Sequence, residues 1–193
     1  MKRYLLFKQY IKIISYLLIL SIVACRQTTT QDSGNNNSET NSDWNTFNQS
    51  SYLISYPTTW TLSQDGQEET EFTILSPIES DNDIFRENIN LVIQDLSGQK
   101  INLDKYVKIS ESQIKASTNS TLIESKRMKN DSGEYHKVIT SADHKAYQLK
   151  FEQYYWVVKN KAYVLTFTSE QDKFDDFKET GEKILNSFKL KKK

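Results

Sequence analysis

The residues of this 193-residue chain that could do chemistry begin with its only two histidines, His136 and His144. Asp131, Glu134 and Asp143 are close to them in sequence. Imidazole and carboxylate groups bind divalent metals, but a site needs three or four ligands that converge on one point. Two histidines eight positions apart do not provide such a set by themselves. Two interpretations follow: a weak divalent-metal site, or a pair of surface histidines.

Motifs for catalysis are missing from the sequence. It contains no Gly-x-Ser-x-Gly, Walker A, dinucleotide-binding or His-Glu-x-x-His pattern. The adjacent carboxylates Glu68–Glu69 and Asp175–Asp176 diverge on a strand or a helix, so they make poor acid–base pairs. We therefore expect a protein that is not an enzyme and uses no cofactor. An envelope enzyme is the third of three functional hypotheses.

An acidic segment is the first candidate for a docking surface. Asp81, Asp83 and Glu87 recur at short intervals within residues 79–88, which the sequence predicts to be a surface loop. The segment lacks the glycine and the terminal glutamate of a calcium-binding loop. We interpret the three carboxylates as a candidate interaction surface.

Aromatic side chains are the second candidate. The chain has 11 Tyr, nine Phe and three Trp, and Tyr154 and Trp156 share one face of a long predicted strand. If that face is partly exposed, the two rings form a binding patch. If helices cover both faces of the sheet, the same rings belong to the core.

The elements that position these residues are predicted over residues 44–190. A helix is predicted over 103–117 from its 3.6-residue spacing, with Asn102 as its N-cap. Turns are predicted at 130–133 and 159–161, which makes two hairpins. Alternation of apolar and polar residues predicts strands at 52–56, 72–75, 89–93, 121–128, 134–140, 146–158 and 163–168.

A second helix is predicted from residue 171 to residue 188. Ser169 is its expected N-cap, with Asp172 three residues later as in a capping box. Gly181 falls on the apolar stripe, where a missing side chain lets a helix approach a sheet closely. The basic tail at 191–193 is interpreted as solvated, with phosphate binding as the alternative.

The N-terminus carries a basic segment followed by an apolar one. Four basic residues lead into an uncharged run from Ile13 to Ala24, which has signal-peptide length and is short for a membrane-spanning helix. The run ends in Ile-Val-Ala-Cys at residues 22–25, which resembles the bacterial lipobox. The resemblance implies cleavage of a signal peptide at 1–24, a diacylglycerol thioether on Cys25 and acylation of the new N-terminus. The alternatives are a short transmembrane anchor and a chance cysteine.

Removal of the predicted signal peptide also changes the net charge of the protein. The whole chain has 25 basic and 25 acidic residues, and removing four basic ones leaves a net charge of −4, which argues against nucleic acid as a partner.

Acyl chains on Cys25 would anchor the protein to a membrane. Residues 26–43 contain no apolar residue, so residues 25–43 are predicted to be the lipidated cysteine and a disordered tether. Arg26 in place of an acidic residue resembles the sorting signal for an outer membrane, facing the periplasm, if the host has two membranes.

Both ends of the predicted domain resemble PsbP-like domains. Tyr52–Trp60 is a strand followed by Tyr-Pro-x-x-Trp, and the closing helix carries Phe-x-x-Phe at 174–177 and Ile-Leu-x-Ser-Phe at 184–188. The resemblance implies an α+β fold, an antiparallel β-sheet flanked by helices on both faces (a PsbP-like α/β/α sandwich). It also implies a non-catalytic assembly or interaction scaffold, and many bacterial members are lipoproteins. No residues match the metal-linked residues of the plant protein, so no photosynthetic role follows.

The sequence therefore predicts a lipid-anchored, non-catalytic interaction or assembly module of the bacterial cell envelope, with an envelope protein as partner. The alternative is an envelope lipoprotein that binds a small ligand or a divalent metal in a pocket between the sheet and the last helix. That alternative requires His136 or His144 to converge with carboxylates.

Overall fold

A computed structural model describes residues 43–65, 70–81, 83–144 and 147–191. The predicted leader, Cys25 and nearly all of the predicted tether lie outside the described residues, as do Lys192 and Lys193. In the part of the chain that is described, neither helix is long and apolar enough to cross a membrane.

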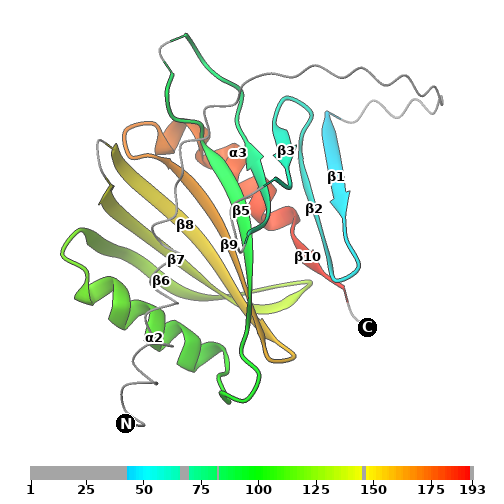
Figure 1. Cartoon of the computed structure of the whole chain (residues 1–193), viewed down its shortest axis with the longest axis vertical. Coiled ribbons are helices and arrows are strands. Elements are labelled where there is room, and N and C mark those ends of the chain that lie inside the picture. The colour runs from blue at the N-terminus through cyan, green and yellow to red at the C-terminus, as the bar shows by residue number, and fades with distance from the viewer. Residues whose placement is uncertain (1–42, 66–69, 82, 145–146, 192–193) are drawn as a thin grey trace.

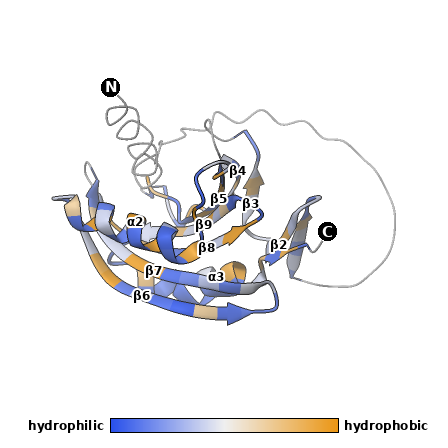
Figure 2. Cartoon of the chain, turned by 90° about the horizontal axis from the view of Figure 1, so that it is seen from below, coloured by the Kyte–Doolittle hydropathy of each residue, from blue (hydrophilic) through white to orange (hydrophobic). Residues whose placement is uncertain are grey.

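Seven strands form the main sheet, in the order β3-β4-β5-β9-β8-β7-β6, and every neighbouring pair is antiparallel (Figure 1). The strands are β3 (Thr61–Ser63), β4 (Thr70–Leu75), β5 (Asn88–Asp95), β6 (Ser120–Asn130), β7 (Gly133–His144), β8 (Tyr147–Val158) and β9 (Lys161–Glu170). The edge strand β6 is mostly hydrophilic (Figure 2), whereas β8 and β9 in the middle of the sheet are buried along most of their length. The six strands predicted from residue 72 onward are thus confirmed, and the two predicted hairpins account for the β6–β7 and β8–β9 neighbours.

The hairpin between β8 and β9 turns within two residues. Val158 pairs with Lys161, and Lys159 and Asn160 between them have φ angles of 50° and 59°. Two consecutive residues in the left-handed region form the turn whose twist matches that of the flanking strands. The hairpin predicted from alternating aromatic and β-branched residues is therefore confirmed.

A second, three-stranded sheet has the order β1-β2-β10, with β1 (Trp44–Asn48), β2 (Tyr52–Pro57) and β10 (Lys189–Leu190). The Ser187 hydroxyl accepts a hydrogen bond from the Ser55 backbone N–H at 2.8 Å and fixes the last helix to β2. Lys191 belongs to the same assembly because its N–H donates to the Ser51 carbonyl at 2.9 Å. The sequence did not predict this sheet or β3, and only Lys191 of the predicted basic tail is described.

The two helices cover opposite faces of the main sheet (Figure 1). Helix α2 (Leu103–Ala116) buries Tyr106, Val107 and Ile114 in a cluster that contains Tyr155 of β8. Helix α3 (Phe174–Ser187) packs on the other face, in a cluster that contains Trp156, the next residue of β8. Successive residues of a strand point to opposite faces, so the alternation in β8 serves both clusters. The predicted sandwich of helix, sheet and helix is confirmed.

The start of α3 differs from the prediction. Ser169 is not an N-cap: it lies in β9, pairs with Lys150 of β8 and is fully buried. The helix starts at Phe174, and its N-cap Lys173 makes no side-chain capping hydrogen bond. The reason is that β9 continues to Glu170, so the expected cap Ser169 pairs across the sheet, and a turn at residues 171–173 precedes the helix. By contrast, the Asn102 side chain accepts the Lys105 N–H at 2.9 Å, which confirms the cap of α2.

Candidate functional site

Tyr154 and Trp156 are core residues, which corrects their assignment to an interaction surface. Their exposed fractions are 3% and 0%. The ring centroids of Trp156 and Phe188 are 5.1 Å apart, and those of Tyr154 and Tyr135 are 4.8 Å apart. Helix α3 and its C-cap Phe188 cover this face, so the second of the two sequence interpretations is the correct one.

His136 and His144 do not come together. Both lie on β7, at its fourth and last positions, which at about 3.3 Å per residue puts them roughly 26 Å apart. Among the described residues, no group of three or more His, Cys, Asp or Glu side chains could hold a metal ion. The convergence of a histidine with carboxylates, which the metal-binding alternative requires, is therefore not found in the described part of the chain.

His136 instead belongs to a polar link between the sheet and α2. Its Nε2 lies 2.7 Å from the Ser125 hydroxyl, and that hydroxyl donates to Glu111 of α2 at 2.5 Å. Burial and the nearby Arg127 lower the pKa of His136, so the ring is neutral at pH 7. Arg127 also pairs with Asp104 of α2, which adds a second polar contact across the same interface.

Ser125, His136 and Glu111 are the residue types of a hydrolase triad, but their order is different. In a triad, histidine accepts the serine proton and the carboxylate orients the far ring nitrogen. Here the carboxylate receives the single serine proton, so His136 Nε2 must be the donor to Ser125. The arrangement therefore ties α2 to the sheet, and His136 does not take the place of the triad base.

The loop between β4 and β5, residues 76–87, is the candidate interaction surface, and its tip is closed by a carboxylate. Asp83 accepts the Glu79 N–H at 3.1 Å with one oxygen and the Phe85 N–H at 3.3 Å with the other. Its side chain is only 3% exposed. Asp83 thus orders the loop and presents almost no surface to a partner, in contrast to its predicted role.

Lys173, the residue before α3, holds the loop against the end of β9. Its ammonium group lies 2.7 Å from Glu79, 4.0 Å from Asp83 and 3.8 Å from Glu170. The hydrogen bond to Glu79 raises the pKa of Lys173, so the lysine is charged at neutral pH. Two of the loop's carboxylates are therefore partly neutralised from outside the loop.

Glu87 at the base of the loop is fully buried, which corrects its assignment to the surface. Its two carboxylate oxygens accept hydrogen bonds from the hydroxyls of Ser76, at 3.3 Å, and Ser169, at 3.4 Å. Burial raises the pKa of Glu87 because the charged form is poorly solvated there. The residue joins both limbs of the loop to β9.

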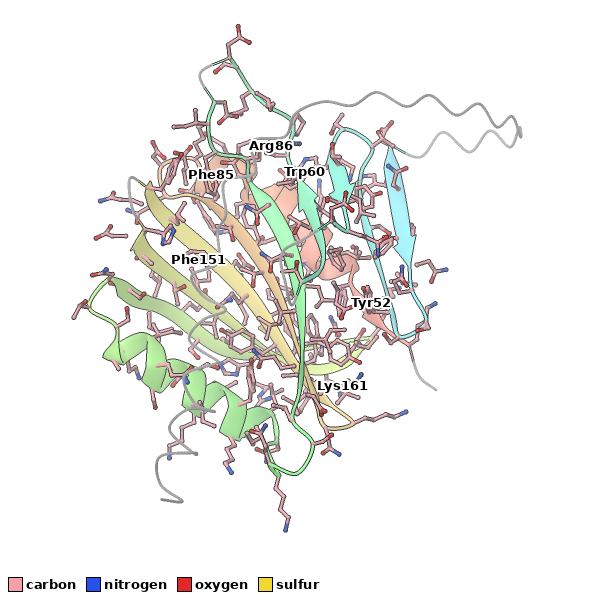
Figure 3. The ribbon with its side chains drawn as sticks, viewed as in Figure 1. Tyr52, Trp60, Phe85, Arg86, Phe151 and Lys161 are labelled. Atoms are coloured by element: carbon pink, nitrogen blue, oxygen red, sulfur yellow. The ribbon has the colours of Figure 1, made fainter. Side chains whose placement is uncertain are left out.

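Phe85 and Arg86 complete the base (Figure 3). Phe85 is buried in a small apolar cluster with Leu149 and Phe151 of β8. Arg86 Nε donates to the Ser76 carbonyl at 2.5 Å and so bridges the two limbs. Where it leaves the sheet, the loop is thus fixed by apolar packing and by hydrogen bonds.

Two of the exposed side chains of this loop are large and apolar. Ile78 and Ile84 are 63% and 73% exposed, and Asp81 between them is exposed as well. Sequence reasoning described the segment as acidic and missed both isoleucines. The available signal was an isoleucine on each side of a polar tip, with no other apolar residue near it except Phe85 and Pro77.

Comparisons with known proteins were made by sequence and by fold. The sequence matches no protein-family model and no curated protein. The structure of the cyanobacterial PsbP protein (CyanoP) from Synechocystis matches with a TM-score of 0.54 at 13% identity, over 82% of this chain and 98% of that one. The fold is PsbP-like.

Other structures share the PsbP-like fold. LpqN of Mycobacterium tuberculosis, which is involved in cell envelope biogenesis, matches with a TM-score of 0.60 at 11% identity, over 78% of this chain and 93% of that one. The Ran-binding protein Mog1p of Saccharomyces cerevisiae has a TM-score of 0.51 at 7% identity, over 76% of this chain and 95% of that one. At such identities the likeness establishes the fold alone.

Proposed function

We propose that this protein is a lipid-anchored, non-catalytic interaction or assembly module of the cell envelope. The observation that carries the proposal is the PsbP-like fold itself, shared with an envelope-biogenesis protein and with a Ran-binding protein. The polar link at Ser125 supports it, because its hydrogen bonds hold helix α2 against the sheet and His136 does not accept the serine proton as a triad base would.

Membrane attachment is part of the same proposal. Acylation of Cys25, at the end of the lipobox-like sequence, would hold the domain at a membrane through a polar tether. The proposed location is the bacterial envelope, at an outer membrane and facing the periplasm where the host has two membranes. The proposed partner is another envelope protein, and nucleic acid is not expected to bind.

The experiment compares the full-length protein with its Cys25→Ala variant in the native cells. Metabolic labelling with an alkyne fatty acid should mark the wild-type protein and leave the variant unlabelled. Chemical crosslinking in intact cells, followed by mass spectrometry, should then give one dominant envelope partner that is lost or reduced in the variant. An unlabelled wild-type protein would refute the anchor, and equal background crosslinking in both would refute the interaction role.

A further inference from the structure

Two isoleucines stand on either side of the closed tip of the β4–β5 loop. The Glu79 N–H donates to Asp83, so the tip closes between these residues, and Ile78 and Ile84 are the next residues outward on the two limbs. They are the most exposed of the large hydrophobic side chains in the described residues, at 63% and 73%. Water-exposed isoleucines on an ordered loop gain free energy when a partner covers them.

Starting from the proposed function, we infer that this loop is the docking surface of the module. Ile78 and Ile84 make the apolar contacts, and the partner is a folded protein with an apolar depression bordered by lysine or arginine side chains. The carboxylates at 83 and 87, which sequence reasoning had placed on the surface, shape the loop from within.

Both limbs of the loop are held by contacts with the domain, which favours binding. Phe85 packs against β8, Lys173 joins Glu79 to the start of α3, and Asp83 closes the tip. A partner then meets the two isoleucines in fixed positions, and little conformational entropy is lost on association. An isoleucine pair on a mobile loop would lack this advantage.

Charge identifies the kind of partner. Of the four carboxylates in residues 76–87, Glu87 is fully buried and the Asp83 side chain is only 3% exposed, so the surface charge of the loop comes from Asp81 and Glu79. Asp81 is exposed and the Glu79 side chain is 47% exposed, so negative charge borders the isoleucines. A basic rim around an apolar depression is complementary to this arrangement. The exposed carboxylate of Asp81 favours such a basic rim over an anionic lipid surface.

The test places a photo-crosslinking amino acid at position 78, 84 or 123 of the full-length lipoprotein in its native cells. Ile123, 54% exposed at an irregularity in the edge strand β6, is the matched control. Positions 78 and 84 should give one discrete protein adduct that position 123 does not give. Mass spectrometry should place the crosslinked peptide beside lysine or arginine residues.

The identified partner is then purified and its affinity measured. Ile78→Ser and Ile84→Ser should each weaken binding by about tenfold to a hundredfold, and Ile123→Ser should leave it unchanged. All three residues are exposed, so the variants should keep the wild-type melting temperature. Adducts to lipid or to a second copy, equal adducts at 123, or no adduct at 78 and 84 would each overturn the inference.

The outcome also separates this inference from the proposed function. If general chemical crosslinking captures an envelope partner while positions 78 and 84 give none, the module function stands and the loop assignment fails. If neither approach captures a partner, both fail.

Discussion

Gly181 in α3 lies so close to the ring of Phe167 in β9 that a Cβ on Gly181 would be 2.9 Å from two ring carbons. Both residues are buried, and Phe167 is fully enclosed. The glycine therefore sets how closely α3 approaches the sheet, as its place on the apolar stripe had indicated.

Replacing Gly181 with alanine should destabilise the protein by about 1–2 kcal/mol. The added methyl must displace a buried ring, which outweighs the gain of about 1 kcal/mol in helix propensity. Urea denaturation of the variant measures the change. Asn186→Ala, an exposed change in the last turn of the same helix, is the control and should not destabilise. Equal stability of Gly181→Ala and wild type would contradict the close-approach argument.

Glu87→Gln should change how stability depends on pH. Burial raises the pKa of Glu87 above its ordinary 4.5, so the folded state favours the neutral acid. Below the ordinary value there is no charge to bury. As pH rises from that value through the raised folded pKa, wild-type Glu87 ionises at a cost to stability. Glutamine avoids this cost, so the variant should match wild type near pH 4 and be more stable at pH 7 to 8.

Chemical denaturation of both proteins from pH 4 to pH 8 checks this sign. The difference between the two curves isolates Glu87, because Glu152 and Glu170, whose pKa values are also raised by burial, are present in both proteins. A difference that is constant across this range, or one that favours wild type at pH 8, would be inconsistent with a buried carboxylate whose pKa is raised.

Structural features were predictable from the sequence where the interacting residues lie close together in the chain. The hairpin at Lys159 and Asn160, the cap at Asn102 and the role of Gly181 follow from residues near one another in the chain. The small sheet could not be predicted, since β10 pairs with β2 across most of the domain and has only two residues. Ser169 was misassigned because pairing with β8 overrode a local capping pattern.

The candidate site was predicted in position but not in composition. The loop at 79–88 was identified from its polarity, yet polarity does not distinguish carboxylates that point outward from those that point inward. Glu87 is held by Ser169, 82 residues away, and Asp83 by the loop's own backbone. Phe85 is the large apolar side chain of this loop that is buried, and Ile78 and Ile84 are left exposed. The local sequence does not show which of the three is buried.

Lys137→Met should destabilise the protein by about 3 kcal/mol at neutral pH. Lys137 Nζ lies 2.7 Å from the fully buried Glu152 and 3.1 Å from Glu182 of α3. Burial opposes the lysine charge, but the interactions with Glu152 and Glu182 together outweigh it and raise the pKa of Lys137. Methionine removes the cation beside the buried Glu152, which must then stay charged without a partner or take up a proton, and either outcome costs stability.

Adding Glu152→Gln to Lys137→Met should recover much of that loss. Thermal or urea denaturation of the single and double variants measures the coupling between the two residues. Purely additive effects would show that Lys137 stabilises the fold through its aliphatic chain and not through the ion pair.

Asn102→Ala should destabilise the protein by about 1 kcal/mol. The Asn102 side chain accepts the Lys105 N–H at the first turn of α2, and alanine leaves that donor without its partner. Asn102→Asp keeps an acceptor at the same place and serves as the control, with stability near that of wild type. Calorimetry on the three proteins compares them, and an alanine variant as stable as the aspartate variant would refute the capping role.

Asp83→Ala should loosen the tip of the β4–β5 loop while the rest of the domain stays folded. Asp83 accepts the N–H groups of Glu79 and Phe85, so both amides lose their acceptor in the variant. Hydrogen exchange at these two amides should become at least about tenfold faster, because each opens locally and without global unfolding. Asp81→Ala, two residues away and exposed, is the matched control and should leave both rates unchanged. If Asp83→Ala left the exchange of both amides at the wild-type rate, the carboxylate would not be what orders the loop. The fixed placement of Ile78 and Ile84 would then need another cause, such as Lys173 or the Phe85 anchor.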